Sequence, residues 1–237
     1  MTPIYKPKGA AKEYGDYAIN IYTGCPHRCY YCFAPNVLHR DREAFHSHVE
    51  PRAGIVEAVA KQLATGKIKG QLIHLCFTCD PYPRGYDSTA TREIIKLIKA
   101  SGNHVQILTK GGSLAKRDFD LLGANDWFGV TITGDFFNDQ HSEPNAAPWF
   151  RSLETVRIAH DRGIKTWVSC EPVLDAHNIL ALISGNWPID RFKVGKLNYH
   201  PSDIKWAEFG KAAEALCIQY GRDYLIKDSL RAEMNKH

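Results

Sequence analysis

Residues 16–33 read DYAINIYTGCPHRCYYCF, in which a strand-like run is followed at once by three cysteines. The run 16–23 is rich in apolar, aromatic and β-branched residues, which favour a strand. Cys25, Cys29 and Cys32 fall on the loop that follows it, with the spacing C-x3-C-x2-C. Three thiolates on one loop can converge on a single inorganic centre. This stretch therefore predicts the first strand of the fold and a metal site directly after it.

The rest of the chain alternates strand-like and helix-like segments in the same way. Strands are predicted at 16–23, 71–78, 105–110, 127–133, 165–173, 191–197 and 224–227, and helices at 52–64, 89–100, 148–162, 178–184 and 202–219. A short helix capped by Ser113 is expected after the third strand. Connections of these lengths require parallel strands. We predict an α/β fold, a partial (β/α)6 TIM-like barrel, with a doubly wound sheet as the alternative.

The composition is that of an ordinary globular protein. Of the 237 residues, 44% are hydrophobic and 24% are charged, which argues against disorder. No apolar run approaches the roughly 20 residues that a membrane span needs. We expect one domain over residues 1–237, with a core at 16–200 and a helical and short-strand closure at 201–237. The first residues show no apolar leader, so a cytoplasmic protein without a membrane partner is expected.

Charge and cysteine content narrow the chemistry. The 30 Lys and Arg exceed the 26 Asp and Glu by four, which permits an anionic partner only where the basic residues cluster. Seven cysteines, an odd number without an export signal, argue against a disulfide framework and for metal or redox chemistry.

The cysteine loop admits three interpretations. One is a zinc site completed by Cys76, Cys79 or His27, and another is three buried thiols without metal. Cys76 and Cys79 fall on a predicted strand, where a separation of three places them on opposite faces, so they make a poor chelating pair. The third is an iron–sulfur cubane, which with three cysteine ligands leaves one iron open.

The loop resembles that of radical S-adenosylmethionine (SAM) enzymes, in which an aromatic residue, here Tyr31, precedes the third cysteine. The stretches 78–82 (TCDPY), 108–110 (LTK) and 116–122 (KRDFDLL) resemble the spore photoproduct lyase-like group of that superfamily. The resemblance implies a [4Fe–4S] cluster on Cys25, Cys29 and Cys32. It also implies that a reductant such as flavodoxin or ferredoxin supplies one electron. SAM is then cleaved to a 5′-deoxyadenosyl radical, which abstracts hydrogen from the substrate.

The resemblance further implies that residues at strand ends bind SAM, namely Tyr31, Phe33, Thr78, Cys79, Asp80, Lys110, Thr131 and Thr133. Tyr31 and Phe33 would flank the nucleoside, and Lys110 would pair with the carboxylate. The three residues from Thr78 would meet the amino group or ribose, and the two later threonines the carboxylate or ribose. Simpler roles stay open: Lys110 as a solvated strand end, Asp80 as a turn residue before a proline, and the threonines as β-formers.

Two residues are candidates for catalysis. The lyase carries a hydrogen-donating cysteine at the position that is Phe77 here, and Cys79 is a nearby thiol. Glu171 follows the fifth predicted strand, where a carboxylate can orient a substrate or shuttle a proton; its alternative is an ion pair with Lys196 or Lys227.

Basic and aromatic residues near the same strand ends are candidates for binding a substrate, namely Tyr82, Arg84, Lys196, Asn198 and Tyr199. The leading hypothesis is a radical SAM enzyme that abstracts hydrogen from a thymine-derived base in DNA, for lesion reversal or side-chain isomerisation. One alternative is radical chemistry on a peptide or small metabolite. The other is a non-catalytic, metal-containing module that binds nucleic acid.

Overall fold

The computed structural model describes residues 2–236 and is built around one sheet of seven parallel strands. The strands are β1 (Tyr17–Ile19), β2 (Leu72–Leu75), β3 (His104–Thr109), β4 (Trp127–Thr131), β5 (Lys165–Cys170), β6 (Arg191–Val194) and β7 (Asp223–Ile226). They lie side by side in chain order, and every neighbouring pair is parallel. A doubly wound sheet reverses its strand order at a switch point. The unreversed order therefore fits the partial TIM-like barrel predicted from the sequence.

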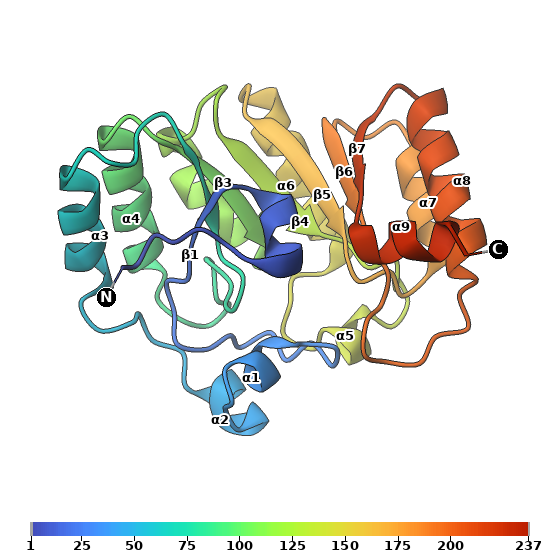
Figure 1. Ribbon diagram of the computed structural model, residues 1–237, viewed down its shortest axis with the longest axis horizontal. Coiled ribbons are helices and arrows are strands. Elements are labelled where there is room, and N and C mark those ends of the chain that lie inside the picture. The colour runs from blue at the N-terminus through green and yellow to red at the C-terminus, as the bar shows by residue number, and fades with distance from the viewer. Residues whose placement is uncertain (1, 237) are drawn as a thin grey trace.

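Helices follow the strands and cover the outside of the sheet (Figure 1). The helical segments are η1 (Gly9–Tyr14), α1 (Ala34–Val37), α2 (Arg42–Ser47), α3 (Ile55–Ala64), α4 (Thr89–Ala100), η2 (Gly112–Leu121), α5 (Asp139–Ser142), α6 (Trp149–Asp161), α7 (Ala176–Ser184), α8 (Trp206–Gln219) and α9 (Asp228–Met234). The short helices α1 and α2 lie apart from the outer layer, below the sheet in Figure 1.

Strand alternation separates two faces of the sheet. On one face, Ile73, Val105 and Phe128 are fully buried in the cluster that packs against the helices. The opposite face lines the barrel interior and carries larger or polar side chains, including His74 and Trp167. Each buried aliphatic side chain contributes roughly 1.5–3 kcal/mol, so the helix-facing side of the sheet stabilises the fold.

Several predicted boundaries are wrong in an informative way. The second strand ends at Leu75, not at Thr78, so Cys76 and Cys79 lie in the loop after it and not on opposite faces of a strand. Ser113 does not cap η2, whose N-cap is Gly111. The apolar Cys76 and Phe77 extend the strand-like composition past Leu75, where β2 ends.

The N-terminal segment η1 enters the barrel, which the sequence did not predict. Gln106 Nε2 donates to the Tyr14 carbonyl at 3.0 Å, and the Tyr14 ring lies 5.3 Å from the His74 ring and 5.9 Å from Trp167. The starts of β2, β6 and β7 line a shallow cavity with η1. Tyr14 therefore occupies the interior of the barrel while η1 covers the N-terminal ends of the strands.

Candidate active site

The three cysteines leave β1 on a tight loop at the C-terminal edge of the sheet. Cys25, Cys29 and Cys32 are free thiols, and Cys29 is the most buried of them. The Cys32 amide donates to the Cys29 carbonyl at 3.0 Å, and the Cys25 amide to the Phe45 carbonyl at 3.3 Å. A Cβ on Gly24 would lie 2.2 Å from the Phe45 carbonyl oxygen, so only glycine permits this approach of the loop to α2.

The chemistry of these thiols fits an iron–sulfur cluster. Burial raises the pKa of Cys29 to about 12 and that of Cys25 well above its ordinary value, so both are neutral when no cation compensates them. Metal coordination supplies that compensation and deprotonates a thiol. Three thiols on one loop, one buried and two partly buried and none in a disulfide, are a donor set that iron accepts.

The zinc alternative gains no support from the geometry. His27 is buried, with Nδ1 3.5 Å from Asp80 Oδ2 and Nε2 accepting the Arg84 amide at 3.5 Å. Cys79 Sγ accepts the Tyr22 amide at 3.4 Å, and Cys76 and Cys79 perturb each other's pKa. Within residues 2–236, no three His, Cys, Asp or Glu side chains, the three loop cysteines included, are grouped to hold a single metal ion. The fourth ligands that the zinc alternative requires are therefore engaged elsewhere.

Lys110, at the end of β3, lies beside the cysteine loop. Its Nζ is 2.8 Å from Glu143 Oε1 and 5.5 Å from the centre of the Tyr31 ring, and the Tyr31 hydroxyl donates to the same Glu143 oxygen. Burial lowers the pKa of Lys110, but the Glu143 carboxylate outweighs this and the pKa lies above its ordinary value. A buried ammonium has three donors, so a charged anchor with spare hydrogen-bonding capacity faces the loop.

Buried polar atoms near the loop that lack a hydrogen-bond partner in the described part of the chain include Thr78 Oγ1, His46 Nε2 and Lys110 Nζ, whose single carboxylate contact is the ion pair above. The backbone around Thr78 is fixed, since Asn20 Oδ1 accepts the Phe77 amide at 2.8 Å and the Thr78 amide at 2.9 Å. Buried polar groups are normally satisfied. Unpaired ones beside the cysteines fit a polar ligand such as SAM.

Asp80 is fully occupied within the protein. Its Oδ1 accepts the Thr109 hydroxyl at 2.6 Å and the Tyr82 amide at 2.8 Å, and its Oδ2 accepts the Lys110 amide at 2.7 Å. These bonds tie the loop after β2 to the end of β3. They favour the turn role that the sequence left open over a contact with SAM.

Burial and hydrogen bonding have opposite effects on the pKa of Cys79. Burial raises its pKa, but hydrogen bonds from the Cys76 thiol and the Tyr22 amide, the latter at 3.4 Å, together lower it below its ordinary value. Burial and the bond to Cys79 raise the pKa of Cys76. The loop after β2 thus carries one donor thiol and one acceptor thiol.

Glu171 lies inside the barrel and forms the ion pair that was its alternative role. Its Oε2 accepts the Tyr14 hydroxyl at 2.6 Å and lies 3.2 Å from Lys227 Nζ. Lys227 is almost completely buried and is also 3.4 Å from Glu13 Oε2. Burial, the Glu171 charge and its hydrogen bond raise the pKa of Tyr14 well above its ordinary value. Nothing in the sequence marked Tyr14.

The remaining SAM-binding candidates lie at the same strand edge. Thr131 ends β4 and is half-buried, whereas Thr133 is buried and its carbonyl accepts the Leu174 amide at 2.8 Å. Phe33 is exposed beside Cys32.

The residues predicted to bind a substrate differ in their exposure and in their hydrogen-bond partners. Tyr82 is wrong as a stacking surface, because it is fully buried and its hydroxyl donates to Asp118 Oδ2 at 3.1 Å. Lys196 is committed to Glu233 Oε1 at 2.5 Å, and Asn198 Nδ2 donates to the Lys196 carbonyl at 3.3 Å. Arg84 is exposed but donates to the Ala146 carbonyl at 2.5 Å. Tyr199 is 96% exposed.

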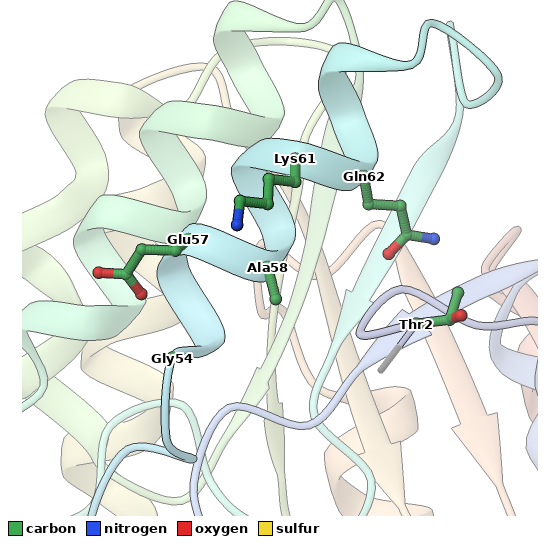
Figure 2. Close-up of a pocket in the computed structure, with 6 residues that line it drawn as sticks. All are labelled: Thr2, Gly54, Glu57, Ala58, Lys61 and Gln62. Atoms are coloured by element: carbon green, nitrogen blue, oxygen red, sulfur yellow. The ribbon is translucent and has the colours of Figure 1, made fainter.

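A groove elsewhere on the surface has no connection to these residues. It is lined by Thr2 and by the outward residues of α3, with Glu57 and Lys61 on its wall (Figure 2). Gln62 also holds the N-terminal segment there, accepting the Ile4 amide at 2.8 Å and donating to the Ile4 carbonyl at 2.7 Å. None of the candidate site residues lines this groove.

The fold and the cysteine loop together define a class of protein, and comparison with known families agrees. The Radical SAM superfamily model matches residues 19–175, so the chain belongs to that superfamily. Membership implies an iron–sulfur cluster and SAM as cofactors. No helix within residues 2–236 is long and apolar enough to cross a membrane.

Among curated proteins, the chain is 28% identical over 200 residues to the uncharacterized protein ORF301 of Acidianus two-tailed virus, covering 75% of this chain and 65% of that protein. It is 32% identical over 121 residues to the uncharacterized protein Rv2578c of Mycobacterium tuberculosis strain H37Rv, covering 49% of this chain and 35% of that protein. The chain thus spans less than two thirds of the length of these relatives.

Solved structures share the fold. A spore photoproduct lyase mutant with bound AdoMet and dinucleoside spore photoproduct matches with a TM-score of 0.63 and 15% identity, covering 94% of this chain and 66% of that one. Streptococcus suis SuiB bound to S-adenosylmethionine matches with a TM-score of 0.66 and 12% identity, covering 88% and 49%. At these identities the likeness concerns the fold alone.

Proposed function

We propose that this protein cleaves SAM reductively at a [4Fe–4S] cluster held by Cys25, Cys29 and Cys32. The observation that carries the proposal is that three free thiols on one loop lie beside the Lys110 ammonium, whose carboxylate contact is Glu143 alone, with the unpartnered Thr78 hydroxyl at the same strand edge. When bound, the cluster supplies one electron and an open iron position for SAM.

The chain's own residues bind and orient SAM. Lys110 is placed to neutralise a carboxylate, and a charge-assisted hydrogen bond of this kind is worth about 1.5–3 kcal/mol. Glu143 holds Lys110 in place until SAM arrives and keeps the Tyr31 ring turned toward the site. Thr78 offers a hydroxyl, and Thr131 and Thr133 lie at the end of the neighbouring strand β4. Phe33 gives an exposed aromatic surface for the nucleoside.

We propose a thymine-derived base in DNA as the substrate. The support is the fold shared with spore photoproduct lyase complexes that contain a dinucleoside spore photoproduct. Tyr199 and Arg84 are exposed, and the exposed aromatic ring can stack on an extruded base. A flavodoxin or ferredoxin is proposed as the electron donor.

The return of a hydrogen atom distinguishes lesion reversal from isomerisation. Phe77 occupies the position of the lyase donor, and its ring packs 4.4 Å from His74 and 5.5 Å from Tyr14. Cys79 is the nearby thiol that can replace it as donor. If Cys79 does not serve, 5′-deoxyadenosine returns its own hydrogen and SAM is regenerated, as in an isomerisation.

The first experiment uses anaerobically reconstituted protein. Iron and sulfide are counted, dithionite and SAM are added, and 5′-deoxyadenosine is measured by mass spectrometry. Cys29→Ala is expected to lose both the cluster and the product. Cys217→Ala, which removes a buried thiol on α8 away from the loop, is the matched control and is expected to retain both. Zinc in place of iron in the wild-type protein would contradict the proposal and leave a metal-containing binding module.

The second experiment addresses the substrate. Because SuiB matches the fold as well as the lyase does, deoxyadenosine formation is compared with thymine-dimer DNA, undamaged DNA and a peptide mixture. Stimulation by the damaged DNA alone supports lesion reversal. Stimulation by peptide and not by DNA would contradict the DNA proposal.

A further inference from the structure

Helix α2 supplies hydrogen bonds to the backbone of the cysteine loop at all three cysteines. Arg42 Nη2 donates to the Cys29 carbonyl at 2.6 Å and to the Tyr30 carbonyl at 2.8 Å, and its Nη1 donates to the Cys32 carbonyl at 3.1 Å. His46 Nδ1 lies 2.7 Å from the Cys25 carbonyl. A carbonyl can only accept, so His46 carries its proton on Nδ1.

The two side chains act together because of their spacing. Residues 42 and 46 are four apart in α2 and therefore lie on one face of the helix. Asp41 caps this helix by accepting the Ala44 amide at 2.8 Å, and Phe45 anchors it as a fully buried residue. The close approach at Gly24 brings the same face against the loop. We call Arg42 and His46 the α2 clamp.

We infer that the α2 clamp fixes the cysteine loop in its ligating conformation and that Arg42 in addition raises the reduction potential of the bound cluster. The inference deepens the proposed function and rests on it. Arg42 and His46 are positioning residues, since their hydrogen bonds reach backbone carbonyls of the loop.

The effect on the loop conformation follows from the hydrogen bonds that Arg42 donates to the loop carbonyls. A guanidinium that holds the carbonyls of Cys29, Tyr30 and Cys32 prevents each of these peptide groups from rotating, and so fixes the directions of the cysteine side chains. Without a donor these carbonyls turn to water, and the loop samples shapes that do not ligate iron. Partners of this kind are typically worth about 10–100-fold in metal affinity.

The electronic part follows from charge. Reduction adds one electron to a cluster that already carries the charge of its thiolates, and a fixed cation nearby stabilises the more negative state. Arg28 is also near the loop, but it is paired with Glu43 on α2 and donates to no cysteine carbonyl. Arg42 has no carboxylate within ion-pairing distance among residues 2–236, and because it is exposed only solvent and salt screen its charge.

The test compares substitutions that separate charge from geometry. Arg42→Gln removes the charge and the fork, whereas Arg42→Lys keeps the charge but cannot span three carbonyls. His46→Leu removes the donor to Cys25, and His46→Asn keeps an amide near the Nδ1 position. Arg28→Gln is the matched control, because it removes a neighbouring charge and no carbonyl hydrogen bond.

Two readouts are taken on folded, reconstituted protein, with folding checked by circular dichroism. The rate of cluster loss to an iron chelator reports the clamp, and an EPR-monitored redox titration reports the potential. Arg42→Gln is expected to lose its cluster about tenfold faster or more and to have a more negative potential. Arg42→Lys and His46→Leu are expected to lose the cluster faster with a smaller shift in potential. His46→Asn and Arg28→Gln should resemble the wild type in cluster loss.

The outcomes separate the inference from the proposed function. The inference is overturned if the wild type binds the cluster and the Arg42→Gln variant has the same rate of cluster loss and the same reduction potential. That result would leave the proposed function intact. A wild type that binds no cluster under reconstitution overturns both. If Arg42→Gln does not fold, Arg42→Lys and His46→Leu decide the conformational part by the same chelation rate.

Discussion

The cysteine loop and the barrel interior are both polar and both buried, yet they differ in how their charges are satisfied. Beside the loop, Lys110 Nζ contacts one carboxylate, that of Glu143 at 2.8 Å, and Thr78 Oγ1 has no hydrogen-bond partner among the described residues. In the interior, Lys227 contacts two carboxylates, and Lys193 lies 4.4 Å from the Tyr14 ring and 4.6 Å from the Trp167 ring. Unpartnered atoms occur in both regions, since Glu13 Oε2 and His74 Nε2 also lack a partner among the described residues, so the regions differ in that one carboxylate holds Lys110 and two hold Lys227.

The largest expected effect is a loss of stability when the ion pairs of the barrel interior are disrupted. Lys227→Met leaves Glu13 and Glu171 without their shared cation, and removing one partner of a buried pair costs roughly 3–5 kcal/mol. We expect the free energy of unfolding, measured by urea titration, to fall by that order while the SAM affinity of the refolded, loaded protein stays the same. Adding Glu171→Gln should recover part of the loss. A large change in SAM affinity with little loss of stability would contradict this division of roles.

The next largest effect is on the affinity for SAM at Lys110, beside the cysteine loop. Lys110→Met removes the proposed carboxylate anchor, so SAM affinity by calorimetry should fall by about 10–100-fold, the equivalent of roughly 1.5–3 kcal/mol. Lys116→Met, on the neighbouring η2, is the control and should bind SAM as the wild type does. Unchanged affinity in Lys110→Met would mean that Lys110 serves only to hold Glu143.

A third effect depends on pH. Burial, followed by the charges of Arg191 and Lys227, lowers the pKa of Lys193 to about 7. Between that value and the ordinary lysine pKa of about 10.4, the unfolded chain binds a proton that the folded chain does not. Lys193 therefore makes the free energy of unfolding rise with pH across this window, by at most about 1.4 kcal/mol per unit.

The measurement is urea unfolding from pH 7 to 10 for the wild type and for Lys193→Met. Other groups titrate in this window, so the difference between the two slopes isolates Lys193. The variant is expected to show the shallower rise. Parallel curves would contradict a buried, largely neutral amine at this position.

The smallest effect on stability is expected for substitution of the exposed Tyr199. Tyr199→Ala removes a side chain that is 96% exposed and should change the free energy of unfolding by less than about 0.5 kcal/mol. If Tyr199 stacks on a base, binding of single-stranded DNA weakens by about 1–3 kcal/mol. Tyr220→Ala, on the far end of α8, is the control. Equal DNA binding by both variants would remove Tyr199 from the proposed substrate surface.

The predicted fold and cysteine site depended on short-range patterns. All seven strands exist within a few residues of their predicted positions, because alternation and apolar runs are local properties. The predicted strand ends differ more from the structure. The apolar Cys76 and Phe77 were predicted to lie in the second strand, but β2 ends at Leu75. Tyr82 was misassigned for a related reason, since a sequence does not say on which side of an element an aromatic ring becomes buried.

By itself, the sequence determined the cysteine spacing, the parallel alternation and the superfamily to which the chain belongs. Only the tertiary structure decided which polar groups are paired. Tyr14 reaches Glu171 across 157 positions of the chain, and Tyr31 reaches Glu143 across 112. Even Arg42, 13 positions from Cys29, reaches its carbonyl only because Gly24 lets the loop fold back on α2. Spacing encodes neighbours along a turn or strand, whereas such partners depend on where the packed core brings distant segments together.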